Sequence, residues 1–388
     1  MRWPTRPVEQ IPPTQFRPPH CPHADCIQHR VQTGFRYKLD GRYPRMSPPR
    51  RVQRFRCKAC GGSFSQQTFS WSYYLKKPQL GPQVAAALNA GSANRQIARS
   101  LGCAPSTVTR LSARLGRHAL LLHFFLLQHL GTLSEPVVLD HFETFVSCQL
   151  DALGVGTVVG HHSWFVLALD PAPHRRGGRL TPAQKQLRER RRIPRPKPGS
   201  VRRSCRRLLD LLVEMLGPED CLQLITDNHP AYGPAVTRHP ASSRIQHHIY
   251  PNPARGPKGA PRSPQARERD EAMFPGDQYH ALLRHTCAHH RRETIAFPRR
   301  INASLERGFL TAVWRNLVKW RSERRPDRST PAMVLGLTDR VWSWNRVLAQ
   351  RLFPSRVEVP KPWMRLYNRE WDEDGAGRYT RHRLKHAM

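Results

Sequence analysis

Acidic residues are scarce in this chain of 388 residues, which has 28 Asp and Glu against 64 Lys and Arg and a formal net charge of +36. A positive excess this large predicts attraction to a polyanion, with a strength that falls as the salt concentration rises. Part of the arginine and proline content could instead reflect a GC-rich genome. The length is sufficient for two or three domains with buried cores.

Long apolar runs are also lacking. No apolar segment follows Met1, so we expect no signal peptide. The most apolar run, at 119–127, is shorter than the roughly 20 residues that cross a bilayer. It predicts a buried or partner-facing helix, and the stretch 119–130 is a candidate surface for self-association. We therefore expect a cytoplasmic protein with no membrane partner.

The nine cysteines lack the spacing of a secreted disulfide framework, which indicates a reducing compartment. Four of them form two close pairs separated by about thirty residues. Such pairs predict a zinc ribbon, with a tight turn whose amides face the thiolates. A reduced cluster without metal is the alternative, and His20 or His23 could replace a cysteine. The expected zinc ligands are Cys21, Cys26, Cys57 and Cys60.

The segments beside these cysteines are basic. Residues 1–20 are rich in proline and arginine and predict a loose arm before the ribbon. Between the two pairs, basic residues interleave with aromatic ones. That pattern suits phosphate contact, but it is also common in loops that are merely solvated.

Residues 94–111 have the pattern of a helix-turn-helix. The small Ala98 lets two helices cross closely, Gly102 supplies the turn, and Pro105 fits the first turn of the second helix. We expect the second helix to enter the major groove of duplex DNA. A helical hairpin with no role in DNA binding would have the same spacing. The residues expected on the outward face are Ser106, Thr107, Thr109 and Arg110.

Two acidic residues each follow an apolar strand. Asp140 comes after the run 137–139, and Asp227 comes after the run 222–226. Two carboxylates at one edge of a sheet, in a very basic chain, predict a divalent-metal site for phosphodiester chemistry. Either acid alone would more simply be a solvated turn residue.

The remaining pattern predicts an α/β fold. Strands at 154–159 and 163–169 would continue the first acidic strand as a meander, and another strand is expected at 245–250. A helix at 201–216 leads into the second acidic strand, which predicts a crossover to a parallel strand. Proline- and arginine-rich loops are expected at 171–200 and 251–270, and helices at 277–292, 301–323 and 331–352.

A two-metal site usually includes a third carboxylate. Asp277 would open the helix 277–292, and Arg284 lies two turns later on the same face, where it could bind a phosphate beside the metals. An ordinary ion pair explains Glu293, and Glu306 could be a surface residue of a long helix. The remaining candidates are Asp270 and Glu271.

The chain resembles the DDE insertion-sequence transposases, most closely the IS-one type, in the order of its parts. These parts are a zinc ribbon, a helix-turn-helix, an acid-bearing sheet, and a helix in which an arginine follows an acid by seven residues. The stretch 284–299 is similar to the family's segment after its third acid. The resemblance makes Asp140, Asp227 and Asp277 the catalytic carboxylates. Their basic partner would be Arg284. The family usually has Glu at the third place, where this chain has Asp277.

The resemblance implies an RNase H-like domain in which the three acids hold two Mg²⁺ or Mn²⁺ ions that cleave and join DNA strands. It also implies binding of double-stranded DNA at element ends and target, with the basic loops 174–195 and 251–269 on flanking or target DNA. A homo-oligomer associated with the nucleoid in a bacterial cytoplasm is expected. Glu143 and His229 could contact the substrate or support the metal ligands, or they could be simple capping residues.

Four regions are expected along the chain. They are a basic arm and zinc ribbon (1–78), a helix-turn-helix region (79–130), an RNase H-like catalytic domain (131–300), and a helical C-terminal region with a basic tail (301–388). Three alternatives remain: a DNA-binding regulator, a catalytically inactive relic that still binds DNA, and a structure-selective nuclease on the same fold. The regulator leaves both strand-end acids unexplained, and Asp277 in place of Glu is the reason to consider the relic.

Overall fold

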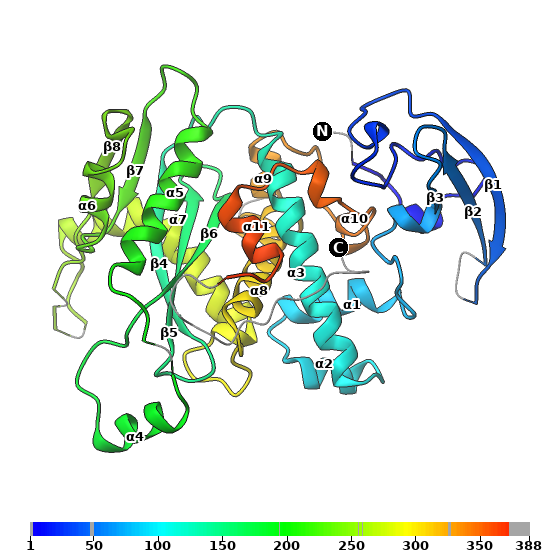
Figure 1. Cartoon of the computed structure of the whole chain (residues 1–388). Coiled ribbons are helices and arrows are strands. Elements are labelled where there is room, and N and C mark those ends of the chain that lie inside the picture. Colours follow the sequence, from blue (N-terminus) through cyan, green and yellow to red (C-terminus); the bar gives the residue numbers. More distant parts are fainter. Residues whose placement is uncertain are drawn as a thin grey trace.

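The computed structural model describes residues 3–46, 50–193, 195–254, 256–257, 259–324 and 327–371. Within them the fold is mixed α/β. Figure 1 shows a small three-stranded sheet near the N-terminus, helices in the middle and a five-stranded sheet at the far side. No helix in these ranges is long and apolar enough to cross a membrane.

The N-terminal sheet is antiparallel, with the strand order β1-β2-β3. Along β2, Phe55 and Cys57 point inward while Arg54 and Arg56 are exposed, which is the alternation of a strand with one buried face. Phe353, from the C-terminal region, packs into the core of this sheet. The elements are β1 (Tyr37–Pro44), β2 (Arg51–Cys57), β3 (Ser63–Ser65) and the short helices η1 (Val8–Gln10), η2 (Ile27–His29) and η3 (Gln66–Phe69).

The loose arm predicted for residues 1–20 is wrong for its described part. Trp3, Val8 and Phe16 are each less than a tenth exposed. The Trp3 ring stacks on Trp342 with centroids 5.5 Å apart, and the Val8 N–H donates to the Ala349 carbonyl at 2.8 Å. Trp3 and the backbone of Val8 therefore fix the arm to the C-terminal region, and the Phe16 ring packs on Phe55 and Phe69 of the ribbon.

The helical part begins with three helices that include the predicted helix-turn-helix. Pro105 is at the first turn of α3, as expected, and Gly102 has φ +57° in the turn before it. The apolar half of α3 is buried against α8 and β6, and His123 Nε2 lies 2.8 Å from the Leu167 carbonyl oxygen. The prediction of a buried helix is therefore confirmed for residues 119–127, and this part cannot be the self-association surface that we also considered, whereas Gln128 and His129 are exposed. The helices are α1 (Leu80–Asn89), α2 (Asn94–Ser100) and α3 (Pro105–Leu127).

The large sheet has the order β6-β5-β4-β7-β8. The strands β4, β5 and β6 form the predicted antiparallel meander, and β7 and β8 continue it in parallel with β4. The helix α5 crosses from β6 to β7, which confirms the predicted crossover. The bounds are β4 (Val137–Phe145), β5 (Ala152–Gly160), β6 (Val166–Pro173), α5 (Ser200–Glu214), β7 (Leu222–Thr226), α6 (Tyr232–Thr237), η4 (Ser242–Arg244) and β8 (Ile245–Ile249).

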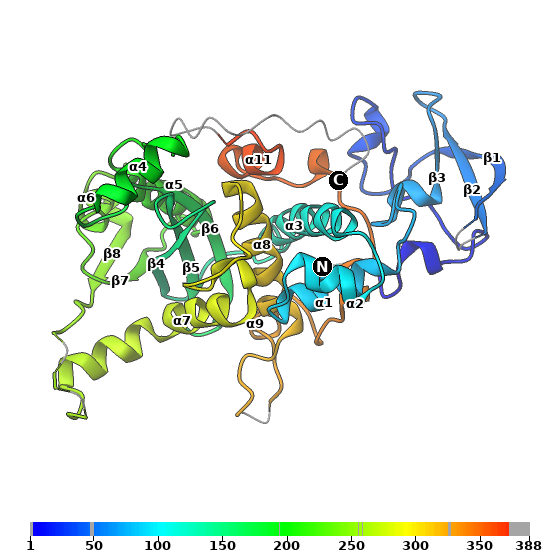
Figure 2. The same ribbon diagram turned by 90° about the horizontal axis from the view of Figure 1, so that it is seen from below.

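Helices cover both faces of this sheet (Figure 2). The position of Gly156 faces α5, since a Cβ there would lie 2.7 Å from Leu208. The next residue, Thr157, faces the opposite side and meets His280 of α7. Because successive side chains alternate between faces, every residue of β5 and β6 is buried.

The C-terminal half differs from the sequence prediction at several helix ends. The loop expected at 251–270 contains the start of α7, because Ser263 caps the Ala266 N–H and Pro264 occupies the first turn. The loop at 171–200 likewise contains α4, capped by Thr181. The elements are α4 (Pro182–Arg190), α7 (Pro264–Thr286), η5 (Ala288–His290) and α8 (Ile301–Val313), which continues as the π-helical turn η6 (Trp314–Val318).

The long helix predicted at 331–352 is wrong. Gly336 has φ +67° directly after the first short helix and ends it. Ser343 then caps a second short helix. The final elements are α9 (Pro331–Val334), α10 (Trp344–Val347), η7 (Pro354–Arg356) and α11 (Lys361–Tyr367), and most of the predicted basic tail lies outside the described residues.

Candidate functional site

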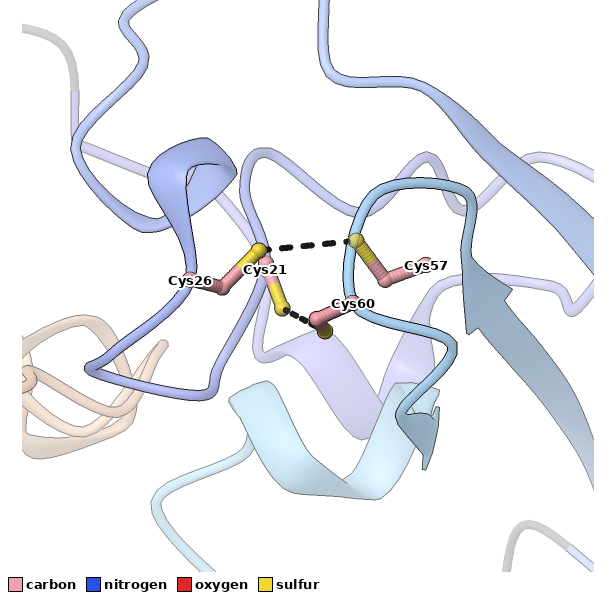
Figure 3. Close-up of side chains that lie close together, drawn as sticks. All are labelled: Cys21, Cys26, Cys57 and Cys60. Carbon is pink, nitrogen blue, oxygen red and sulfur yellow. Dashed lines mark hydrogen bonds between the residues drawn. The ribbon is translucent and has the colours of Figure 1, made fainter.

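The four predicted zinc ligands meet at one point of the ribbon (Figure 3). The Sγ atoms of Cys21 and Cys60 are 3.7 Å apart, as are those of Cys26 and Cys57. All four sulfur atoms lie within 4.8 Å of one another. Zinc–sulfur bonds of about 2.3 Å at tetrahedral angles place sulfur atoms about 3.8 Å apart. The cluster therefore has the dimensions of a tetrahedral zinc site with four cysteine ligands.

The turns that carry the cysteines direct amides at sulfur, as the sequence predicts. The Ala59 N–H donates to Cys57 Sγ at 3.4 Å, and the Gln28 N–H donates to Cys26 Sγ at 3.4 Å. Burial acts to raise the pKa of Cys57, but the backbone N–H groups of Cys60 and Ala59 outweigh it and lower that pKa. These amides stabilise thiolates, which are the form that binds zinc.

The histidines near the cluster are not needed as ligands. Burial lowers the pKa of His20 to about 4, and its Nδ1 lies 2.9 Å from the Cys21 carbonyl oxygen. The His23 ring packs over Gly62, where a Cβ would lie 2.5 Å from the ring. The four cysteines can therefore supply all four ligands of a metal, and His20 and His23 lie beside the cluster.

The two strand-end acids lie at the same edge of the large sheet. β4 pairs with β7 through Val137 with Leu224 and Val138 with Ile225. Asp140 and Asp227 each follow the last pair by two residues, so they occupy equivalent levels where the strands diverge. Asp140 remains within β4, whereas Asp227 lies just beyond the end of β7.

Asp277 reaches this edge from α7. The helix already begins at Pro264, so Asp277 is in its interior and does not open it as predicted. The neighbouring Gly276 lets α7 approach β4 closely, because a Cβ there would be 2.9 Å from a methyl group of Val138. Met273, one turn earlier, is buried against Val138 and Ile225. The packing of α7 on β4 thus sets the position of Asp277.

The electrostatics of Asp140 reflect both neighbouring acids. Burial, followed by the charge of Asp227 and then that of Asp277, raises the pKa of Asp140 from 3.8 to about 7. The carboxyl group also receives hydrogen bonds at Oδ1 from the His141 N–H at 2.7 Å and the Tyr232 hydroxyl at 3.3 Å. Its ionised form is therefore unfavourable until a cation is present.

The carboxylates of Asp140, Asp227 and Asp277 lie near one another, but their oxygen atoms do not form a compact ligand cluster. Among the described residues, only the four cysteines bring three or more possible ligand atoms within 4.8 Å. Asp277 is held by Arg269, which forms a short ion pair with Oδ2 and lies 3.4 Å from Oδ1. Asp227 accepts from Asn252 Nδ2 at 3.1 Å and from the His229 N–H at 3.0 Å. Coordination of a shared cation would require at least the Arg269 contact to open.

Three side chains beside Asp140 were not predicted. His280 Nδ1 lies 3.6 Å from Asp140 Oδ2, and His280 Nε2 lies 2.7 Å from Thr157 Oγ1. Burial lowers the pKa of His280 to about 3, so this ring is neutral. On the other side, His141 Nδ1 lies 2.9 Å from the Tyr232 hydroxyl. His280 follows Asp277 by three residues, a helical spacing that could have been found, whereas Tyr232 follows only from tertiary packing.

Arg284, two helical turns after Asp277 in α7, lines a basic cavity at the end of β4, and none of the three acids is among the residues that line it. Its guanidinium donates to the carbonyls of Glu143 at 2.8 Å and His290 at 3.1 Å, and it lies 4.5 Å from the centre of the Phe142 ring. The cavity has a volume of about 280 Å³. Its charged or titratable lining residues are Glu143, His174, Arg176, Arg284, Arg291 and Arg292.

Glu143 and His229 have local roles that the sequence left open. Glu143 Oε2 lies 3.1 Å from His174 Nε2, and this contact raises the pKa of His174. The His229 backbone N–H caps the Asp227 carboxylate, and its ring lines a second cavity of about 470 Å³ with His174. Both residues therefore lie at the rim of the acidic edge.

The other acids considered for the third position lie elsewhere. Glu306 is buried in α8 and accepts from Arg369 Nε at 2.8 Å. Asp270 pairs with Arg262, whose Nε is 3.0 Å away. Glu271 and Glu293 are exposed. Of these candidates, Asp277 is the one whose charge contributes to the raised pKa of Asp140.

The outward face of the helix-turn-helix is partly engaged. Ser106, Thr109 and Arg110 are exposed, while Thr107 is half-buried. Thr109 Oγ1 donates to the Pro105 carbonyl at 3.0 Å and lies 3.3 Å from Asn94 Nδ2 of α2, so it joins the two helices. Two exposed arginines of α2, at positions 95 and 99, extend the basic face beyond the predicted residues.

Comparison with known proteins adds no assignment. The sequence matches no protein-family model and no curated protein. The chemistry of the chain therefore follows from its own geometry. It has four cysteines spaced as in a zinc site, three carboxylates at one edge of the large sheet, and a basic cavity lined in part by Arg284.

Proposed function

We propose that this chain is a DNA transposase of the DDE type, which binds the ends of its element and uses two divalent cations to cleave and join DNA strands. One observation carries the proposal: Asp140, Asp227 and Asp277 converge on one sheet edge, where burial and the other two charges raise the pKa of Asp140. A fold that keeps acids close at an electrostatic cost indicates a cation site.

The sheet supports an RNase H-like domain over 131–300. A three-stranded meander continued by two parallel strands, with helices on both faces, is the mixed sheet that we expect of that fold. The acids come from the central strand, the adjacent parallel strand and a helix packed across them. Along the sequence the acids follow the same order: first β4, then the end of β7, then α7.

The roles of the chain's residues follow from their positions. Bound Mg²⁺ or Mn²⁺ would activate the attacking oxygen and stabilise the leaving oxygen. Asp140 would be one of the ligands and would give up its proton when the ions bind. Asp277 would leave Arg269 and complete the ligand set. Arg284, already oriented by the Glu143 and His290 carbonyls, would hold a DNA phosphate in the basic cavity.

Recognition of DNA is assigned to the N-terminal half. The net charge of +36 supplies attraction to the phosphate backbone. Ser106 and Arg110 at the start of α3 are exposed and would face the major groove. Zinc in the four-cysteine cluster would hold the ribbon folded beside them.

The test is strand transfer by the purified protein on a labelled element end with Mg²⁺ or Mn²⁺. We expect metal-dependent joining that is lost in Asp140→Ala, Asp227→Ala and Asp277→Ala, each compared with Glu293→Ala as an exposed acid outside the site. Activity that survives Asp277→Ala would refute the assignment of the third acid. End-specific binding without cleavage under either metal would instead favour a zinc-ribbon regulator or an inactive relic.

A further inference from the structure

A separate groove lies on the zinc-ribbon part of the chain. Figure 1 shows this part at the end of the molecule away from the large sheet. It has a volume of about 950 Å³ and runs between the three-stranded sheet and the segment that follows η3. None of the described residues that line it is acidic. The lining side chains used below are Tyr43, Arg45, Arg54, Gln67, Tyr74 and Lys76.

Tyr74 presents an aromatic ring to solvent at this groove. The residue is 61% exposed, although aromatic residues of this size usually bury much of their surface. Its φ of +61° lies in the left-handed region, which a bulky side chain rarely adopts. The turn is held by the Leu75 N–H, which donates to the Ser72 carbonyl at 2.8 Å. Strain retained at an exposed ring points to a role in binding.

The neighbouring ring supports Tyr74 from within the groove. The centroids of Tyr73 and Tyr74 are 4.3 Å apart, with the planes inclined by 66°. Behind Tyr73 lies the guanidinium of Arg351, 5.1 Å from the ring centre. The contact with Tyr73 therefore holds the Tyr74 ring in position without a ligand.

Cationic and donor groups flank the ring. Lys76 and Arg54 are exposed on the two sides of the groove, and Arg54 has Asp40 at 3.6 Å as a surface counter-charge. Arg45 joins the sheet to the segment by donating to Gln67 Oε1 at 2.7 Å and to the Leu75 carbonyl at 3.3 Å. Gln67 is 4% exposed, and its Nε2 has no hydrogen-bond partner among the described residues. An oxygen of a ligand could satisfy this donor.

We propose that this groove binds a single-stranded segment of nucleic acid, with an unpaired base stacked on Tyr74 and the backbone beside Lys76 and Arg54. An exposed aromatic ring with cations on both sides is suited to an unpaired base and its phosphates. In a duplex the flat faces of the bases are already stacked on one another, so duplex DNA cannot use the ring. This site is independent of the carboxylate edge and of the cations proposed there.

The test measures binding of a labelled eight-nucleotide oligothymidine to the full-length, zinc-containing protein without Mg²⁺ or Mn²⁺. Tyr74→Ala should weaken binding by about 5- to 150-fold, the range seen when one stacking aromatic is removed. Tyr74→Phe keeps the ring and should retain the affinity. Lys76→Ala should reduce the slope of log affinity against log salt by about 0.7, the loss of one single-strand phosphate contact. Lys77→Ala is the matched control, since Lys77 is exposed but does not line the groove.

Photocrosslinking distinguishes this groove from other basic surfaces. An oligonucleotide with one iodouracil should form its adduct within the peptide that contains Tyr74, in wild type and in Asp140→Ala alike. An adduct only on other peptides, or an unchanged affinity in Tyr74→Ala, would overturn the proposal and would favour a protein-binding surface. A hairpin duplex that competes as well as the single strand would also overturn it. Comparison of DNA and RNA oligomers then identifies the source of the strand, and either result supports the groove.

Discussion

Replacing Asp140 with Asn is expected to stabilise the metal-free fold by an amount that grows with pH. Burial and the charges of Asp227 and Asp277 raise the pKa of Asp140 from 3.8 to about 7, so the folded state holds this proton more tightly than the unfolded state. The stability that the proton contributes is fully present below about pH 4 and is lost as the pH rises through 7. The asparagine variant has no such titration.

The size of the effect follows from these two pKa values. Between about pH 5 and pH 8, the free energy of unfolding of wild type should fall by about 2 to 3 kcal/mol relative to Asp140→Asn. The Asp140 side chain is only 20% exposed, so solvent does little to reduce this difference. The measurement is urea unfolding followed by tryptophan fluorescence in buffers without Mg²⁺ or Mn²⁺. Chelators are left out so that zinc stays in the ribbon.

A matched control is Glu219→Gln, at an exposed carboxylate in the turn before β7. It should leave the pH dependence of unfolding unchanged. Adding Mn²⁺ at pH 8 should stabilise wild type more than Asp140→Asn, because the neutral amide of asparagine is a much weaker ligand than the carboxylate. A constant difference between Asp140→Asn and wild type from pH 5 to pH 8 would refute the argument that the ionised carboxylate is destabilised by its surroundings.

Three further outcomes test the other parts of the site. Cys57→Ser should lower the zinc content well below one per chain, measured by mass spectrometry of the metal, and should lose the cooperative unfolding of the ribbon. Arg269→Gln should raise the affinity for Mn²⁺ about tenfold in calorimetry, because Asp277 no longer has to leave a charged partner; an unchanged affinity would show that the pair does not compete with the cation. Gly276→Ala should destabilise the fold by about 1 to 3 kcal/mol in urea unfolding, and adding Asp277→Glu to that variant should recover Mn²⁺ affinity but not stability.

The sequence predicted those elements that depend on the spacing of residues close together in the chain. The cysteine spacing predicted the four-cysteine cluster, and the turn around Gly102 with Pro105 after it predicted the two helices. The strand periodicity predicted the meander and the crossover. Each of these depends on short-range chemistry: thiol spacing, helix capping, or alternation of apolar residues. These signals do not depend on the rest of the fold.

The errors arise where distant segments decide the outcome. The arm before Cys21 looked solvated from its composition, but Trp3 packs on Trp342 and orders it. The apolar end of α3 was predicted to be buried or to face a partner, and the sequence could not decide between the two; α8 buries it, and Gly116 earlier in α3 packs directly on Glu306. Tyr232 and Asn252, which contact Asp140 and Asp227, come from segments whose proximity no local spacing encodes. Only the tertiary packing brings them to the site.

Under the proposed function, Gly276 would compensate for Asp277 at a position where the family that the sequence resembles usually has Glu. Aspartate is shorter by one methylene, so its carboxylate reaches a shared cation only if the helix lies closer to the sheet. Gly276, adjacent to Asp277, permits such an approach, since even one Cβ there would come within 2.9 Å of Val138. The glycine and the aspartate are thus two parts of one geometry: the first brings α7 toward β4, and the second needs that proximity. The shorter acid therefore argues for a shifted helix more strongly than for a lost site.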